Sequence, residues 1–197
     1  MKGQGGSGFS AMVLFIAAAL TAAIAAMVII GATTSAQGHA AAAAQQTIQT
    51  SGTAVQIIRV EGIEVNTTSQ TVRKFLLYTR LAPGSEPVLL NRTAVILYTP
   101  SGRQLFVFGG AVANSSVVTT YNGLYYLDRN NSISNSGVLY NGVLGPNDLA
   151  ALVVFSNVSL GTSQIWQFSI IPPNGQPYSL LGVTPAAMIY PTVILYG

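Results

Sequence analysis

The amino-acid sequence predicts an α+β protein, with a long hydrophobic N-terminal α-helix followed by an all-β, immunoglobulin-like β-sandwich domain. Two observations predict the helix: residues 9–30 are almost wholly apolar, and no proline occurs before Pro83. A third observation predicts the β-domain. From Val55 onward, short runs rich in Val, Ile, Tyr, Phe and Thr alternate with turn residues. This pattern is typical of β-sandwiches and barrels.

The apolar N-terminal segment is long enough to span a membrane. At about 1.5 Å per residue, a helix over residues 9–30 would measure about 33 Å, against a hydrocarbon core of about 30 Å. Apolar residues occupy every face, so this helix must be enclosed on all sides by lipid or by protein. The side chains expected on its enclosed surface are Phe9, Val13, Leu14, Phe15, Ile16, Leu20, Ile24, Met27 and Ile30.

The charge-free stretch extends well beyond the apolar segment. No residue between Lys2 and Arg59 carries a full charge. The Ala-, Gln- and Thr-rich run that follows the apolar segment keeps a helical composition but is more polar. We therefore expect one long helix over residues 4–54 with a softened middle at Gly31 and Gly38.

The β-domain is expected to comprise residues 55–197. Several of its strand-like runs are apolar at consecutive positions, which is more than one packed core requires. Pro191 lies inside the last run, and proline cannot donate a ladder hydrogen bond, so this strand is predicted at a sheet edge. The adjacent basic pair Arg73 and Lys74 is expected on a solvated strand face.

Composition and charge exclude several classes of function. Only 7% of the residues are charged, against about 25% in an ordinary soluble domain, so much of the surface is expected to lie against lipid or other protein. The net charge of +3 comes from scattered basic residues. Binding to nucleic acid requires clustered Lys and Arg, so no nucleic-acid partner is expected. The absence of cysteine removes disulfides, thiolate metal sites and cysteine nucleophiles.

The sequence predicts no enzyme and no cofactor. Gly3, Gly5 and Gly8 match the spacing of a dinucleotide-binding loop, but only two residues precede Gly3, so the required strand is missing. His39, the only histidine, lies in an Ala-rich run with no acid or nucleophile beside it, whereas a catalytic triad needs an oriented partner.

One loop has part of a metal-binding pattern. Asp128, Asn130 and Ser132 have the opening spacing of a calcium loop, yet Leu139 stands where the bidentate Glu should be. The 128–136 loop therefore remains a candidate without its main ligand, and no metal site is assigned.

Glycosylation sequons are a further motif of the β-region. Asn-X-Ser/Thr is the acceptor pattern for N-linked sugars in secreted proteins. Bulky sugars would solubilise a surface so poor in charge, although turns of β-rich exterior sequences also accumulate Asn, Ser and Thr without being modified. The candidate acceptors are Asn66, Asn91, Asn114, Asn130 and Asn157.

The N-terminus combines a basic residue, a glycine-rich stretch and a transmembrane-length helix. Lys2-Gly3 is followed by Gln4 and then by the segment AMVLFIAAALTAAIAAMVII. This arrangement resembles the N-terminus of the archaellin (archaeal flagellin) family, whose class III, type IV pilin-like signal is cut before the helix. Cleavage is expected between Gly3 and Gln4. Because the glycine-rich stretch is longer than the family pattern, Gly5–Gly6 is the alternative, and the leader comprises residues 1–3 or 1–5.

The resemblance implies a secreted structural subunit of the archaeal flagellum (archaellum) filament, polymerising through its N-terminal helix for swimming motility. The implied partners are further copies, other archaellin paralogues, a prepilin-type signal peptidase, the basal machinery, and the membrane before assembly. Two alternatives remain open: a subunit of an archaeal type IV pilus-like adhesion filament, and a membrane-anchored extracellular β-sandwich binding module. A plain membrane anchor would explain the apolar helix equally well.

Overall fold

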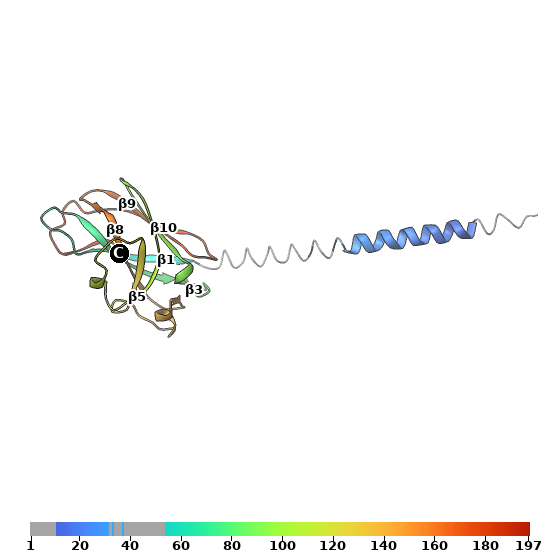
Figure 1. Ribbon diagram of the computed structural model, residues 1–197, viewed down its shortest axis with the longest axis horizontal. Helices are drawn as coiled ribbons and strands as arrows, with labels where there is room; N and C mark the ends of the chain where they lie inside the picture. The colour runs from blue at the N-terminus through green and yellow to red at the C-terminus, as the bar shows by residue number, and fades with distance from the viewer. Residues whose placement is uncertain (1–10, 32, 34–36, 38–53) are drawn as a thin grey trace, which may run out of the picture. The chain divides into compact units, whose positions relative to one another are not determined.

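The computed structural model describes residues 11–31, 33, 37 and 54–197. The chain divides into two compact units, residues 1–47 and 48–197, which are described separately (Figure 1). Several predictions fall outside the described residues. These are the leader, both cleavage positions (Gly3–Gln4 and Gly5–Gly6), Phe9, Gly38, His39 and most of the second half of the predicted helix.

The first unit contains a helix over Ala11–Gly31, which confirms the predicted helix for these residues. Alanine, leucine and methionine make up more than half of its residues, and these residue types favour a helix. The one polar side chain between Ala11 and Gly31, Thr21, donates its hydroxyl to the carbonyl oxygens of Ala17 (3.0 Å) and Ala18 (2.9 Å). This threonine therefore adds no unsatisfied polar group to the apolar surface.

The second unit is built on one nine-stranded sheet with the order β10-β9-β4-β5-β6-β8-β2-β1-β11, and a separate pair, β3-β7. Within this sheet the pairs are antiparallel except β5 with β6. The strands are β1 Val55–Ile63, β2 Val72–Leu81, β3 Val88–Leu89, β4 Ala94–Thr99, β5 Gly102–Val112, β6 Leu124–Asp128, β7 Val143–Leu144, β8 Ala150–Leu160, β9 Ile165–Ile171, β10 Tyr178–Val183 and β11 Thr192–Tyr196. Three short 3-10 helices lie between them: η1 Leu90–Arg92, η2 Ser115–Val117 and η3 Leu139–Asn141.

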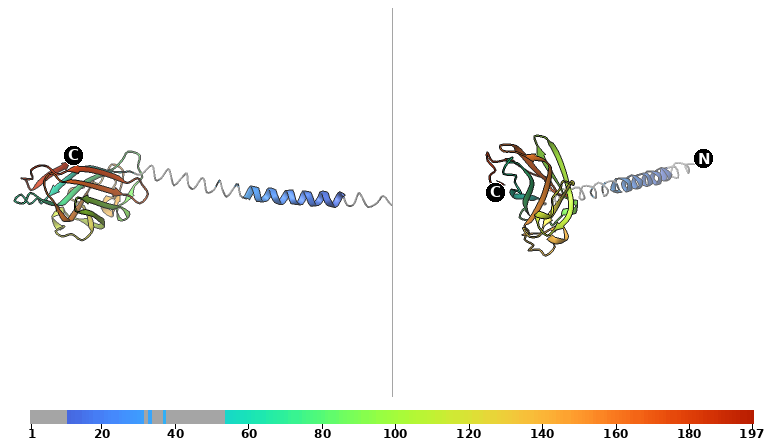
Figure 2. Two further views of the ribbon diagram at one scale, coloured as in Figure 1. Left: turned by 90° about the horizontal axis from the view of Figure 1, so that it is seen from above. Right: turned by 60° about the vertical axis from the view of Figure 1, so that its left-hand side comes forward.

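The sheet coils so that its two halves face each other across one core (Figure 2). Phe75 on β2 and Phe168 on β9 belong to strands far apart in the sheet order, yet their ring centroids are 5.5 Å apart. Near the two ends of the sheet, Ala54 bridges Gln176 in parallel. The result is a largely β-sheet domain with sandwich-like layers, as predicted.

A second apolar cluster lies on the outer side of β2, β6 and β8. It contains Leu76, Ala151 and Val153, and Val118 from the segment between β5 and β6 packs onto it. This cluster explains the strands that are apolar at consecutive positions: here the sheet buries both of its faces. The predicted excess of apolar residues is thus partly used inside the domain.

The edge position of the last strand is confirmed. β11 is the final strand of the sheet and pairs only with β1 within it. Pro191 lies directly before β11, and its carbonyl oxygen accepts a hydrogen bond from the amide of Val65 (2.9 Å). Proline at the start of an edge strand costs no ladder hydrogen bond.

The prediction for the basic pair on β2 is half wrong. Arg73 is exposed, and its guanidinium lies 5.7 Å from the centroid of the Phe155 ring. Lys74, in contrast, is only 2% exposed, and its ammonium contacts the carboxylate of Glu64 at 2.5 Å. The register between β2 and β8 shifts between Val72 and Lys74. Lys74 pairs with Ile63 on β1 and with Phe155 on β8, which both belong to the second apolar cluster, so it lies on the part of the outer side that the domain covers.

Candidate functional site

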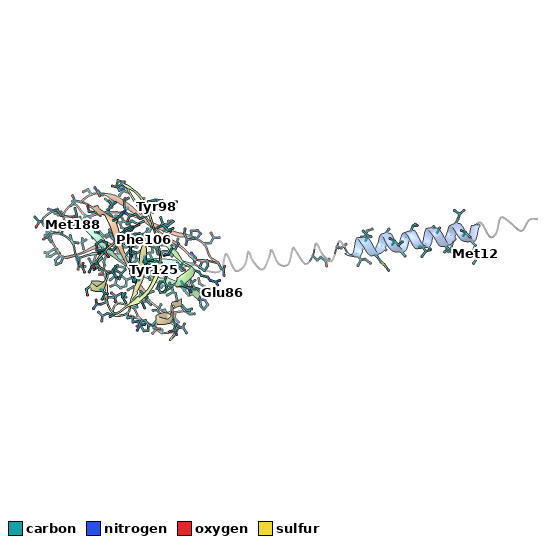
Figure 3. All side chains as sticks on the ribbon, viewed as in Figure 1. Met12, Glu86, Tyr98, Phe106, Tyr125 and Met188 are labelled. Carbon is teal, nitrogen blue, oxygen red and sulfur yellow. The ribbon has the colours of Figure 1, made fainter. Side chains whose placement is uncertain are left out.

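The N-terminal helix presents apolar side chains in all directions (Figure 3). Eight of the nine side chains predicted to form its enclosed surface lie within it, with exposed fractions between 49% for Ile16 and 76% for Phe15. The helix is long and apolar enough to cross a membrane. A helix that is apolar on every face must be enclosed by lipid or by other protein, because its side chains cannot remain exposed to water. It is therefore the first candidate functional element of the chain.

The five sequon asparagines are exposed and lie at the periphery of the β-domain. Asn66 lies between β1 and β2, and its Oδ1 accepts from the amides of Thr68 (3.1 Å) and Ser69 (3.0 Å). Asn114 caps η2 by accepting from the amide of Ser116. In both turns the side-chain oxygen is held by backbone amides, and the residue as a whole is exposed.

The sequons differ in their hydroxyl residues. Thr68, Ser116 and Ser159, which belong to the sequons of Asn66, Asn114 and Asn157, are exposed. Thr93 and Ser132, which belong to the sequons of Asn91 and Asn130, are buried. Their hydroxyls donate to the carbonyls of Leu89 (2.9 Å) and Asp128 (2.5 Å), respectively.

The 128–136 loop uses its acidic side chain to close its own turn. Asp128 is fully buried, and its carboxylate accepts from the amides of Asn130 (2.9 Å) and Asn131 (3.2 Å) and from Nδ2 of Asn131 (2.8 Å). Leu139, at the position of the missing calcium ligand, is a buried core residue. In the part of the chain that is described, no three His, Cys, Asp or Glu side chains lie close enough to hold a metal ion.

Asp148 is a structural carboxylate that the sequence analysis did not single out. It is 1% exposed and accepts hydrogen bonds from the amides of Asn135, Ser136 and Gly145 and from the hydroxyl of Ser136. Burial by itself would raise the pKa of Asp148, but the hydrogen bonds, led by those from Ser136, lower it below its usual value. Only the turn sequence Gly-Pro-Asn-Asp hinted at this role.

Most of the remaining carboxylates are paired with bases rather than with each other. Glu61 contacts Arg59 at 2.5 Å, and Glu64 contacts Lys74. Proton-transfer chemistry needs an acid and a base converging on a substrate, and these pairs are local structural contacts. Burial also raises the pKa of Tyr125, whose hydroxyl donates to the carbonyl of Leu90 at 2.7 Å inside the core.

Comparison with known proteins gives one consistent result. The family model for archaeal-type flagellin matches residues 5–181. The chain is 28% identical over 192 residues to "Flagellin B5" of Pyrococcus abyssi (strain GE5 / Orsay), with 87% of this chain and 84% of that protein covered.

Two solved structures show the same fold. The crystal structure of archaeal flagellin FlaB1 from Methanocaldococcus jannaschii has a TM-score of 0.60 at 19% identity, covering 73% of this chain and 96% of that one. The archaeal flagellum of Methanospirillum hungatei strain JF1 has a TM-score of 0.69 at 13% identity, covering 96% of this chain and 99% of that one. The fold with one apolar N-terminal helix and a β-domain is thus shared over almost the whole chain.

Proposed function

The chain belongs to the archaeal-type flagellin family, and from this premise we propose that it is a structural subunit of the archaellum filament, which serves swimming motility. The observation that carries the proposal is the helix Ala11–Gly31, apolar on every face and joined to a β-domain. The protein acts by assembling with further copies and not as an enzyme. Neither the adhesion filament nor the anchored binding module is favoured by the family match.

The helix would serve two environments in turn. Before assembly it would lie in the cytoplasmic membrane with the β-domain outside, and after assembly it would bundle with other copies at the filament axis. An unpaired charge carried into lipid or into a dry bundle costs several kcal/mol, which accounts for a helix without charges. Its many alanines would let neighbouring helix backbones approach closely.

Processing is expected to precede assembly. A prepilin-type peptidase would remove residues 1–3, or 1–5, so that the filament subunit begins at Gln4 or at Gly6. Mass spectrometry of purified filaments gives the N-terminus directly. Retention of Met1 to Gly3, or cleavage beyond Ile30, would contradict this part of the proposal.

Glycosylation is proposed at the sequons. All five acceptor asparagines are exposed, and support is strongest for Asn66, Asn114 and Asn157, where the hydroxyl residue is exposed too. Glycopeptide mapping should find sugars at these three positions at higher occupancy than at Asn91 and Asn130. A filament whose peptides carry no added mass at any of the five positions would show that the sequons are not used.

The central experiment is genetic and structural together. Cells lacking this chain should lose archaella under the electron microscope and should stop spreading in soft agar, and re-expression should restore both. Cells that keep swimming filaments but lose surface attachment would point to the adhesion filament instead. The proposed partners, other archaellin paralogues and the basal machinery, would be identified from purified filaments with their basal complexes.

A further inference from the structure

The β-domain leaves one apolar sheet face uncovered. We call it the apolar outer face, and it consists of outward-facing side chains on β10, β9, β4 and β5. Cross-strand pairs place these residues side by side: Val183 lies opposite Ile165, and Leu181, Gln167, Tyr98 and Arg103 form one row across four strands. The large exposed members are Leu181 (65%), Ile165 (58%), Val183 (54%), Leu105 (50%), Val107 (47%) and Tyr98 (38%).

The same domain covers the other half of its sheet by itself. On β2 and β8, the outer residues Leu76, Ala151 and Val153 are at most 3% exposed, because the segment between β5 and β6 packs Val118 onto them. The chain thus provides a cover for one outer region and none for the other. An apolar face of this extent, left bare on a domain, marks an interaction site.

Two independent features leave the apolar outer face open to contact with another protein chain. None of the five sequon asparagines lies on β4, β5, β9 or β10, so no sugar would stand in the way. No residue after Asp148 carries a charge, whereas an ordinary stretch of that length would have about a dozen. Arg103, at one end of β5, is the charged side chain that borders the face.

The face also has a recess that could receive a side chain. A groove of about 360 Å³ is lined by Tyr98, Pro100, Ile165, Trp166 and Leu181, among others. Interfaces typically anchor on large apolar side chains seated in such recesses.

A second apolar surface lies at the C-terminal end of the chain. It comprises Ile189, Tyr190, Ile194 and Tyr196, with exposed fractions of 62%, 69%, 55% and 42%. We call it the C-terminal surface. It lies on β11 and the segment before it. In the sheet order the strands β6, β8, β2 and β1 separate β5 from β11, and the coiling of the sheet brings β10 into contact with β11. Glu61, which forms an ion pair with Arg59, lies opposite Ile194 and borders this surface. The domain therefore presents two different surfaces that consist mainly of apolar side chains.

We propose that the apolar outer face of one subunit docks on the C-terminal surface of a neighbouring copy. This inference rests on the proposed filament function, which supplies the second copy. Contact between two identical faces closes a dimer, whereas contact between two different faces repeats from copy to copy and gives a helical array wherever the rotation between copies does not close a ring. Two unlike surfaces that both consist mainly of apolar side chains, one with Arg103 at its border and the other with the Arg59–Glu61 ion pair at its border, meet this requirement.

Engineered cysteines test the contact cleanly, because the chain has no cysteine of its own. Filaments of full-length Leu105→Cys/Ile194→Cys protein are oxidised and run on a non-reducing gel. The expected result is a ladder of covalent multimers. Each single variant alone should remain monomeric, and a mixture of the two should give dimers. The control pair Leu105→Cys/Asn141→Cys, with the exposed Asn141 on η3, should give no ladder.

A second variant tests the same contact without cross-linking, in case the cysteine variants do not assemble into filaments. Leu181→Lys should lower filament yield at least tenfold by placing a charge on the apolar outer face, whereas Asn141→Lys should leave it unchanged. The emission of Trp166, the only tryptophan and fully buried, confirms that each variant is folded.

The outcomes separate this contact from the filament function. Dimers from Leu105→Cys alone would show like faces in contact and would overturn the proposal. So would a double variant that cross-links no more than its control, or Leu181→Lys filaments at wild-type yield; in each case the filament function would stand. An unaltered chain that forms no filament would instead remove the proposed function.

Discussion

Gly182 on β10 offers a quantitative test of how the β-domain packs. An added Cβ would lie 2.3 Å from Cζ2 of Trp166 and 2.8 Å from Cε2 and Cη2 of the same ring. Trp166 is fully buried and tilts against Phe168, with the ring centroids 5.6 Å apart. The indole therefore has little room to retreat, and β10 itself must shift.

Overpacking of this kind costs about 1–3 kcal/mol. For a domain of about 150 residues, each kcal/mol lowers Tm by about 2–4 °C. We therefore expect Gly182→Ala to unfold about 2–12 °C below the unaltered chain. Because Leu181 and Val183 flank this glycine and belong to the apolar outer face, a shift of β10 should also lower filament yield.

Trp166 is both the side chain that the added Cβ would contact and the fluorophore that reports unfolding. Its emission, followed during thermal unfolding of the detergent-solubilised full-length chain, comes from no other residue. Gly161→Ala is the matched control, because its added Cβ would meet nothing closer than 3.7 Å, and it should leave Tm unchanged or slightly raised. Equal Tm values for Gly182→Ala and the unaltered chain would refute the packing described for Trp166 and β10.

Three further predictions concern the helix and two buried polar groups. Ala23→Asp should abolish filaments, because it buries an unpaired carboxylate in the bundle, whereas Arg92→Ala on η1 should assemble normally in electron micrographs; normal Asp-variant filaments would exclude a helical core. Asp148→Asn should cost about 1–3 kcal/mol near neutral pH, because its amide would face the Gly145 amide. Since the pKa of Asp148 is lowered in the folded state, the difference in unfolding free energy between the two proteins should be complete above about pH 5. It should shrink as the pH falls through the folded pKa. A difference in denaturation midpoint that does not change with pH would contradict this role of Asp148. Tyr125→Phe should cost about 1 kcal/mol and should weaken the loss of stability that the raised tyrosine pKa predicts above about pH 10, as measured by alkaline unfolding.

The helix and the β-character of the domain could be predicted because each depends on a local pattern. Residues 9–30 are apolar at every helical face, and the later runs carry β-branched and aromatic residues between turn sequences. The N-terminal motif also pointed to the family that the comparisons show.

The pairing of strands could not be predicted in the same way. β1 pairs with β11, which is the last strand of the chain, and no local pattern specifies a partner so distant. Lys74 is buried beside Ile63 and Phe155 on the covered outer side of the sheet, and these neighbours come from other strands and not from the residues next to it in sequence. Asp148 accepts hydrogen bonds from the amides of Asn135 and Ser136, and the loop conformation that brings these groups together could not be predicted from the sequence.

The apolar outer face could be predicted only in part from the sequence. Its residues alternate with buried ones along β9 and β10 as expected for strands. Which of the apolar positions would be covered by the domain itself, as Leu76 and Val153 are, depended on the path of the β5–β6 segment. That path follows from the whole packed domain.

The pairing of β1 with β11 has a consequence for the order of events during folding. β1 is the first strand of the β-domain in sequence, and its partner β11, Thr192–Tyr196, lies more than a hundred residues further along the chain. Contacts so distant in sequence form slowly, because the intervening loop must close first. Until then β1 keeps an open edge that can pair with another chain. A β-domain that lacks Thr192–Tyr196 would therefore keep this edge of β1 unpaired, and its sheet would be unfinished.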